Sequence, residues 1–314
     1  MFNTPILFII FNRPDTTFKV FDSIRKRRPK KLFIAADGPR DNKIGEVDLC
    51  KKARSIIDKI DWECEVKTLF RENNVGCQRG PKEAIDWFFE HIEMGIILED
   101  DCLPNESFYT FCELMLIKYK NEDEIMEVSG TNFLLGKFKN RDEYYKSVLP
   151  GIWGWATWKR AWKKMDLNVG INQNFLLERF KSKEYTDYLI QMIKDAKKNK
   201  IDAWDIFWLV TMVNNSGFSI IPLKNLVTNI GISGTHTGEQ TTLHLMPSFY
   251  IDTKRMELLP PLPPSYNLDK ICIENILESL KKGNEKQKAF DAFIIRLKVS
   301  FYYRKGLLLK ILNK

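Results

Sequence analysis

Two apolar stretches near the start of the chain decide the fold: Pro5-Ile-Leu-Phe-Ile-Ile-Phe11 and Lys31-Leu-Phe-Ile-Ala-Ala36. Each has the length of a buried strand, and residues 15–27 between them carry apolar side chains at helical spacing. A strand, a helix and a second strand in this order are typical of a β-α-β unit, in which both strands lie parallel in one sheet. The alternation continues to residue 98. We therefore expect an α/β protein with a mostly parallel sheet flanked by helices.

The composition is that of a globular protein with a sizeable core. Of the 314 residues, 44% are hydrophobic and 29% are charged, which excludes a disordered chain, a fibrous repeat and a polytopic membrane protein. The six cysteines are sparse and form no C-x-x-C pair, so neither a disulfide framework nor a zinc ribbon is expected. The apolar run at residues 6–11 is too short for the core of a signal peptide. These features favour a reducing, cytoplasmic location.

The net charge of +8 belongs to the end of the chain. Residues 281–314 carry ten lysines and arginines against two acids, so the preceding residues are close to neutral. The neutral body offers no basic patch, and nucleic acid is not an expected partner. Residues 289–312 mix apolar and basic side chains in the pattern of an amphipathic helix. That pattern suits an anionic membrane surface, such as the inner face of the cell membrane, and it suits equally a helix packed on the preceding domain.

A proline-rich segment divides the chain. Pro260-Pro-Leu-Pro-Pro264 interrupts the packed pattern and predicts a linker. We therefore expect one domain over residues 1–260, followed over residues 261–314 by the linker and a C-terminal helical appendage.

Three consecutive acids follow a short buried strand. Glu99-Asp-Asp101 comes directly after Gly95-Ile-Ile-Leu98. In an open α/β sheet, ligands bind beyond the carboxyl ends of the strands. Clustered carboxylates repel one another unless a cation compensates them, and their hard oxygens suit Mn²⁺ or Mg²⁺, which share their ligands with substrate phosphates. The triplet therefore indicates a metal site, and the alternative is a solvated acidic turn.

Two other strand ends carry polar side chains toward the same edge. The first strand ends in Asn12-Arg13-Pro14 and the second in Asp37-Gly-Pro-Arg40. Asp37 can accept a hydrogen bond from a base or a ribose, and Arg13 or Arg40 can bind a base or a phosphate. Each motif alone also fits a turn in which the aspartate caps the backbone. Together they favour a nucleotide site.

The motifs, taken in order, resemble those of GT-A fold glycosyltransferases that use nucleotide sugars. The resemblance rests on Phe11-Asn-Arg-Pro14, Ala36-Asp-Gly-Pro-Arg40, Asn73-Asn-Val-Gly76 and Glu99-Asp-Asp101. Two later blocks, Pro150–Trp158 and Asn225–Gly231, resemble blocks of the bacterial family-two-like group. The layout is also similar to that of the Golgi enzymes that add N-acetylglucosamine to mannose. The resemblance covers residues 4–240 and implies a GT-A (Rossmann-like) fold with a donor half over residues 1–125 and an acceptor half over residues 126–260.

The resemblance implies roles for residues at the donor site. Asp101 matches the acid that holds the divalent ion directly, and Asp100 matches the acid that faces the ribose or sugar of the donor. Arg13 and Asp37 match positions that contact the nucleotide base. The implied cofactor is Mn²⁺ or Mg²⁺.

The resemblance also extends to the acceptor side. Asp205 lies in a Trp-Asp pair that matches the catalytic base of the inverting enzymes, and Asp202 is the nearest alternative carboxylate. His236 matches a loop that closes over the diphosphate. Trp153 and Trp155 fall in a glycine-containing turn, where we expect one ring to contact a sugar and the other to pack in the core.

These expectations combine into one reaction. Glycosyl transfer expels a charged diphosphate, which a divalent cation neutralises, and passes through an oxocarbenium-like state. A carboxylate must also accept the proton of the acceptor hydroxyl. We therefore expect a metal-dependent, inverting glycosyltransferase of the hexosyl- or N-acetylhexosaminyl- type. Its donor would be a nucleotide-diphosphate sugar, with UDP favoured, and its acceptor a cell-surface glycan or a lipid-linked precursor.

Two alternatives stay open. One is a sugar-nucleotide pyrophosphorylase, although the first strand is not followed by the glycine-rich basic loop that such enzymes use. The other is a non-catalytic GT-A-like protein that binds a membrane or nucleic acid through its basic tail. The candidate site residues are Asp205 as the base, Asp101 as the metal ligand, and, around the donor or its sugar, Asn12, Arg13, Asp37, Arg40, Glu99, Asp100, Trp153, Trp155 and His236.

Overall fold

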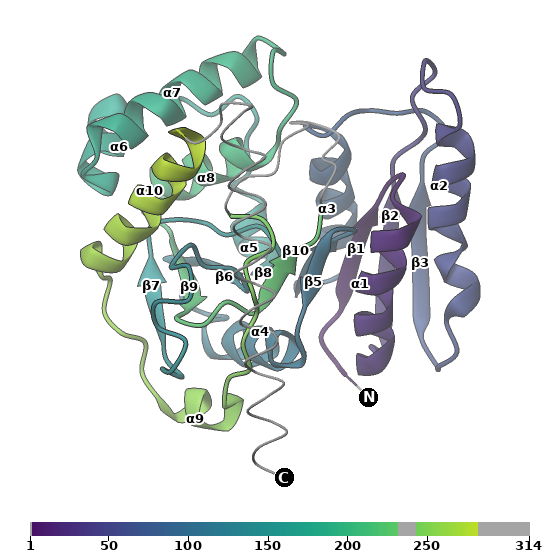
Figure 1. Ribbon diagram of the computed structural model, residues 1–314, viewed down its shortest axis with the longest axis horizontal. Helices are drawn as coiled ribbons and strands as arrows, with labels where there is room; N and C mark the ends of the chain where they lie inside the picture. The colour runs from purple at the N-terminus through teal and green to yellow at the C-terminus, as the bar shows by residue number, and fades with distance from the viewer. Residues whose placement is uncertain (1, 232–242, 282–314) are drawn as a thin grey trace.

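The computed structural model describes residues 2–231 and 243–281, which are built around one central sheet (Figure 1). Eight strands form the sheet in the order β3-β2-β1-β4-β8-β6-β9-β7. The first four of these are mutually parallel, and the remaining pairs are mixed, with β8 antiparallel to both of its neighbours. Helices flank the sheet. The fold class is therefore α/β, as the alternation of apolar stretches predicts.

The N-terminal half, residues 2–124, supplies the parallel part of the sheet. Because Ile10 pairs with Ala36 and Ile9 pairs with Glu99, the carboxyl ends of three strands meet at one edge. The elements of this half are β1 (Ile6–Ile10), α1 (Pro14–Arg27), β2 (Lys31–Ala36), α2 (Glu46–Arg54), the 3-10 helix η1 (Ser55–Lys59), β3 (Glu65–Phe70), α3 (Gly80–His91), β4 (Met94–Glu99), β5 (Cys102–Pro104) and α4 (Glu106–Lys118).

The C-terminal half, residues 125–281, continues the same sheet because β8 inserts between β4 and β6. A separate two-stranded sheet pairs β10 with β5, directly after the acidic triplet. The elements of this half are β6 (Ile125–Ser129), β7 (Tyr144–Ser147), β8 (Trp155–Trp158), α5 (Lys159–Trp162), α6 (Gln173–Phe180), α7 (Lys183–Lys197), α8 (Asp205–Asn214), β9 (Phe218–Pro222), β10 (Val227–Asn229), α9 (Thr253–Leu258) and α10 (Tyr266–Lys281).

The strands alternate their side chains between two cores, as the period of two in a strand requires. On β1, Ile6, Phe8 and Ile10 pack in the cluster that also contains residues of α1, α2 and α4. Leu7, between them, packs in the cluster formed with α3, α5 and α8. The sheet is therefore covered on both faces, and its polar strand ends are left at the edge.

The tryptophan-rich block contradicts part of the sequence interpretation. We expected Trp155 in a turn that could present its ring to a sugar. It is instead the first residue of β8 and is fully buried, at 0% exposure. Its ring lies against those of Trp204, Trp208 and Trp162, with centroids 5.7 to 6.1 Å apart. Burying four large rings together outweighs any turn preference of the glycine before them, so Trp155 is a core residue.

The domain boundary at residue 260 is also wrong. Leu262, in the expected linker, pairs through its backbone with Tyr144. Beyond it, α10 buries Leu268, Cys272 and Ile273 in a third core cluster with α6, α7 and α8. The packed unit therefore extends to Lys281, because a proline-rich stretch can lie along an edge strand without ending a domain.

The remaining part of the expected appendage, residues 282–314, lies outside the described residues. Within residues 2–231 and 243–281, no helix has the length and apolar character needed to cross a bilayer. All six cysteines are free thiols.

Candidate functional site

A cavity of about 150 Å³ lies at the carboxyl ends of β1, β2 and β4. Five residues predicted from the strand ends line it: Arg13, Asp37, Arg40, Glu99 and Asp100. Further lining comes from residues that the sequence interpretation did not assign to the donor: Arg71, Asn74, Gly76, Cys77, Gly80, Pro81 and Asp202. The parallel register explains the first set, because it brings successive strand ends to one edge.

The acidic triplet lies at the end of β4, facing the turn after β1. The guanidinium of Arg13 forms ion pairs with Asp101 and, at 3.3 Å, with Asp100. The backbone N–H of Phe11 donates to the second oxygen of Asp100 at 2.9 Å. Glu99 differs, because its Oε1 is buried with no hydrogen-bond donor among the described residues. The turn after β1 therefore holds Asp100 and Asp101, and Glu99 Oε1 has no hydrogen-bond donor among the described residues.

Burial and mutual repulsion perturb these carboxyl groups. Burial, together with the charges of Asp101 and Asp100, raises the pKa of Glu99 to about 8. Burial raises the pKa of Asp100 to about 6, although the positive charge of Arg13 opposes this shift. For Arg13, burial alone would lower the pKa, but the charges of Asp100 and Asp101 more than offset it and leave the pKa raised. The surroundings therefore disfavour the state in which all of these carboxyl groups are ionised together.

The cluster fits a divalent cation by charge and by donor chemistry. Arg13 contributes one positive charge against three carboxylates, whose hard oxygens are those that Mn²⁺ and Mg²⁺ prefer. The donorless Glu99 Oε1 is the observation that calls for such a partner. Within the described residues, no three acidic, histidine or cysteine side chains already surround one point as metal ligands do. A cation would therefore have to draw the carboxylates together in competition with Arg13.

The block at residues 225–231 reaches the triplet from the C-terminal half. The backbone N–H of Ile230 donates to the carbonyl oxygen of Asp101 at 2.7 Å. A Cβ atom on Gly231 would lie 2.5 Å from Asp101 Oδ2, so a side chain here would require the Asp101 carboxylate to shift. Two motifs that are far apart in the sequence thus meet at the acid predicted to hold the metal.

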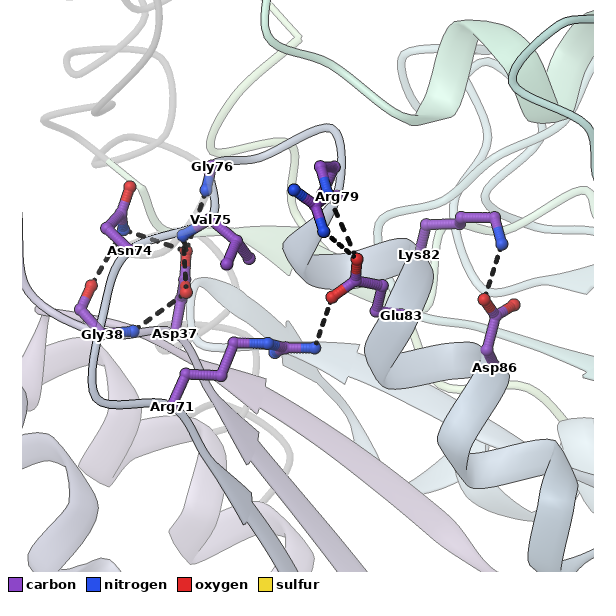
Figure 2. A network of polar contacts seen from close by, with 10 residues as sticks. All are labelled: Asp37, Gly38, Arg71, Asn74, Val75, Gly76, Arg79, Lys82, Glu83 and Asp86. Atoms are coloured by element: carbon purple, nitrogen blue, oxygen red, sulfur yellow. Dashed lines mark hydrogen bonds and ion pairs between the residues drawn. The ribbon is translucent and has the colours of Figure 1, made fainter.

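Asp37 is engaged by the loop before α3, as Figure 2 shows. Its carboxylate accepts from the backbone N–H groups of Val75 and Gly76 at 3.1 Å, from Gly38 N–H at 2.9 Å and from Asn74 Nδ2 at 2.9 Å. Burial is the largest influence on its pKa, which is raised. Asp37 therefore lines the cavity while fastening the loop to the end of β2, a contact that the motif alone predicted only as local capping.

Asn12 and Arg40 converge on Glu46, a buried carboxylate that the sequence interpretation missed. Asn12 Nδ2 donates to Glu46 at 2.8 Å, and the Arg40 guanidinium binds it through Nε at 3.0 Å. The hydrogen bonds from Arg40 are the largest influence on the pKa of Glu46, which is lowered. Glu46 begins α2, where its charge also suits the helix dipole. An acid at a helix start was the available signal, but it does not reveal which strand-end side chains will meet it.

Arg71 is a second cation of the cavity that we did not predict. It follows β3 directly, and its guanidinium binds Glu83 of α3 at 3.1 Å (Figure 2). Its place after the third parallel strand gave the same signal as Arg13 and Arg40, namely a polar residue at a carboxyl end.

Two acids of the C-terminal half approach the cavity. Asp202 accepts from the backbone N–H groups of Cys77 and Gln78 at 2.7 and 2.6 Å. Asp205 is the first residue of α8, and its charge contributes to raising the pKa of Glu99. Asp202 thus lines the cavity, and the charges of Asp202, Asp205 and Glu99 all act on Cys77, which also lines it.

The remaining predicted residues have separate outcomes. Trp153 is partly buried, and its ring lies 5.8 Å from that of Phe133 and 5.0 Å from that of His244. Trp155 is buried, as described above. His236 lies outside the described residues.

Comparison with known proteins adds little to this geometry. No protein-family model matches the chain, and no curated protein matches it. Among solved structures, it is similar to HddC from Yersinia pseudotuberculosis, with 8% identity, 50% of this chain and 77% of that chain covered, and a TM-score of 0.31. It is also similar to an apo UDP-glucose pyrophosphorylase, with 9% identity, 72% and 93% covered, and a TM-score of 0.34. Both scores are low, so the α/β assignment rests on the sheet itself.

Proposed function

We propose that this chain is a metal-dependent glycosyltransferase that takes a sugar from a nucleotide-diphosphate donor. The observation that carries the proposal is the acidic triplet at the end of β4, with a buried oxygen of Glu99 that has no donor among the described residues. It borders a cavity that also contains Arg13, Arg40 and Arg71. Cations beside carboxylates at the edge of an α/β sheet suit a ligand that brings both a divalent ion and phosphates.

Each group has a role in this proposal. Asp101 and Glu99 would hold Mn²⁺ or Mg²⁺, which supplies charge neutralisation for the departing diphosphate. Arg13 would give up part of its ion pairing and bind phosphate, a partner that suits a guanidinium equally well. Asp205, whose charge acts on Glu99, would accept the proton of the acceptor hydroxyl. Asp37 would shape the base site by holding the loop at residues 74–76.

The donor and acceptor can be proposed only by class. A UDP-sugar is the donor we favour, of the hexose or N-acetylhexosamine type, with inversion at the transferred carbon. The acceptor would be a glycan or its lipid-linked precursor, and the basic sequence at residues 282–314 would hold the protein at an anionic membrane. The support for these choices is the ordered set of motifs and the amphipathic pattern of the tail.

A second candidate function is nucleotide binding without metal chemistry. The observation that favours it is the pair of ion bridges from Arg13 to Asp100 and Asp101, because the guanidinium stands where a cation would compensate these acids. On this proposal the protein would bind a nucleotide equally well with and without Mn²⁺.

A turnover assay tests the proposal and separates it from its rivals. With UDP-sugars, Mn²⁺ and a glycan acceptor, the wild type should release UDP. Asp101→Ala should abolish this, and Asp205→Asn should lower kcat by roughly 10²- to 10⁴-fold, the usual worth of a general base, with little change in donor affinity. Asp187→Asn, on the exposed side of α7, is the matched control and should keep full activity.

The outcomes of this assay are distinct. No turnover but metal-independent nucleotide binding would support the second candidate. Formation of pyrophosphate from a nucleoside triphosphate and a sugar 1-phosphate would support a pyrophosphorylase instead. An unchanged kcat in Asp205→Asn would assign the base to another carboxylate.

A further inference from the structure

We propose that Asp202 is a positioning residue, which fastens the connection between α7 and α8 to the loop before α3 and thereby holds Asp205 against the donor site. The inference rests on the function proposed above. It concerns a contact between the two halves of the chain, because Asp202 and Cys77 are 125 positions apart in the sequence.

The loop before α3 is held by two carboxylates through four consecutive backbone amides. Val75 and Gly76 donate to Asp37, at the end of β2. Cys77 and Gln78 then donate to Asp202, at 2.7 and 2.6 Å. Each oxygen of the Asp202 carboxylate accepts one of these two hydrogen bonds. The loop is therefore fixed from the N-terminal half by one acid and from the C-terminal half by the other.

Gly76 is the point at which the amides change direction. Its φ is +87°, in the left-handed region that favours glycine, so the amides of Val75 and Gly76 can face one carboxylate and those of Cys77 and Gln78 another. A Cβ atom at this position would lie 2.7 Å from Asp202 Oδ2. The backbone thus approaches the carboxylate too closely for any side chain, and the contact between the halves depends on this approach.

The contact between Asp202 and the loop is close to Asp205 along the chain. Asp202 and Asp205 are separated by Ala203 and Trp204, and α8 begins at Asp205. Trp204 stacks on Trp155 of β8, with centroids 5.8 Å apart and planes at 23°. Residue 155 pairs in turn with Ile97 of β4, two positions before Glu99. The start of α8 is therefore held on one side by the tryptophan stack and on the other by Asp202, with the acidic triplet nearby.

The hydrogen bonds of Asp202 bear on whether it acts as a positioning residue or as a base. Each oxygen of Asp202 accepts one short hydrogen bond from a backbone amide, which fixes the orientation of the carboxylate toward the loop; each oxygen keeps a second lone pair, so the double-mutant cycle below decides between a positioning role and a base role. Asparagine in its place keeps one acceptor oxygen but turns an N–H₂ group toward the other amide, so at least one of the two bonds is lost.

A double-mutant cycle tests the inference with the full chain. Asp202→Asn, Asp205→Asn and the double variant are assayed for UDP-sugar turnover with Mn²⁺, and kcat is measured separately from donor KM. Because misplacing a catalytic group is costly, Asp202→Asn should lower kcat by roughly 10- to 100-fold, with donor KM changed by less than about threefold. In the Asp205→Asn background the same change should alter kcat by less than about twofold, since the residue to be positioned no longer acts.

Control variants separate positioning from general damage. Asp187→Asn likewise removes one negative charge, here from α7, and should leave kcat unchanged. Asp202→Glu keeps both acceptor oxygens and should recover part of the lost kcat. Amide hydrogen exchange of the peptide covering residues 74–79 should become faster in Asp202→Asn, while the peptides of β1 and β4 keep their wild-type protection.

Four results would overturn the inference. An equal loss of kcat in both backgrounds would mean that Asp202 acts independently of Asp205, as a base or a ligand. An unchanged kcat in Asp202→Asn would mean that the contact positions nothing. Full activity in Asp205→Asn would show that Asp205 takes no part in catalysis, so that Asp202 would have no catalytic group to position. If the wild type still showed metal-dependent turnover in that case, the proposed function would stand. A wild type without turnover and without metal-dependent UDP binding would overturn both proposals together.

Discussion

Glu99 and Arg13 lie in the same acidic cluster and differ in whether nearby groups compensate them. Arg13 is compensated by Asp100 and Asp101, whereas Glu99 is buried beside the same two acids and keeps an oxygen without a donor. The charge of Asp205 adds to this repulsion and helps to raise the pKa of Glu99. A carboxyl group in such a place costs the folded protein stability when it ionises, unless a cation joins it. Glu99 therefore favours the binding of a cation, and its ionised form destabilises the folded protein when no cation is bound.

Glu99→Gln should show this cost as a function of pH. Because the pKa of Glu99 is raised from 4.5 to about 8, the folded protein holds a proton in this range that the unfolded chain has released. The contribution of Glu99 to the free energy of unfolding therefore falls as pH rises from about 4.5 to 8. In metal-free buffer the variant and the wild type should melt together near pH 4.5, and the variant should melt a few degrees higher near pH 8.5.

Differential scanning fluorimetry across this pH range measures the effect. Glu178→Gln, an exposed acid of α6, is the matched control and should show no pH-dependent difference from the wild type. A Glu99→Gln variant that melts lower than the wild type at pH 8.5 would contradict the account. Mn²⁺ should stabilise the wild type more than the variant at that pH.

At this scale, the sequence predicted the residues that strand ends bring together. Arg13, Asp37 and Arg40 were found because parallel strands deliver their carboxyl ends to one edge. Glu46 was not assigned to the site, and Asp202 was named only as an alternative base, because their contacts depend on tertiary packing that brings distant segments together. The sequence placed one ring of the Trp-Gly-Trp stretch in the core but did not reveal that it is Trp155, because the three rings that cover it come from other segments.

Among the elements, the loop between β3 and α3 shapes the cavity most directly. It passes between Asp37 and Asp202, and Gly76 within it adopts a φ of +87°. A β-carbon there would meet Asp202, and the left-handed conformation is itself unfavourable for other residues.

Gly76→Ala should therefore destabilise the protein by about 1–3 kcal/mol, the usual cost of such strain. Gly170→Ala is the matched control, because a Cβ atom there would meet nothing within 4 Å. Urea unfolding of both variants provides the comparison. Equal free energies of unfolding for the two variants would show that the loop is not held as described.

The elements themselves were predicted unevenly. The expected strand at residues 31–36 coincides with β2, because a continuous apolar run between turn signals is unambiguous. By contrast, β5, β7, β8 and β10 have only three or four residues each and were not predicted. Such short strands are defined by their partners in the sheet, and a single sequence carries little of that information.

At the scale of the whole molecule, one sheet joins both halves, and α10 closes the C-terminal half. Asp269 of α10 accepts from Ser147 at the end of β7 at 2.6 Å and from Val148 N–H at 3.2 Å. Burial raises the pKa of Asp269 to about 6. These contacts join the helix to the sheet, so the catalytic body we propose depends on residues that the sequence assigned to an appendage.

Removing α10 should therefore unfold or strongly destabilise the protein. A chain ending at Pro264 loses the buried side chains of Leu268, Cys272 and Ile273, and each fully buried large apolar side chain contributes about 1.5–3 kcal/mol. A chain ending at Lys281 keeps every described contact of α10 and is the reference. Circular dichroism melting should place the shorter chain many degrees below the reference. Equal melting temperatures would restore the boundary at residue 260.

The proposed function requires that a divalent cation and a nucleotide diphosphate bind together at the acidic triplet, on the edge of the sheet. Calorimetric titration of UDP into the full chain, with and without Mn²⁺, tests this most directly. We expect Mn²⁺ to tighten UDP binding at least tenfold in the wild type, Asp101→Ala to remove this gain, and Asp187→Asn to retain it. Equal UDP affinity with and without Mn²⁺ in the wild type, or an undiminished metal effect in Asp101→Ala, would contradict the proposed function.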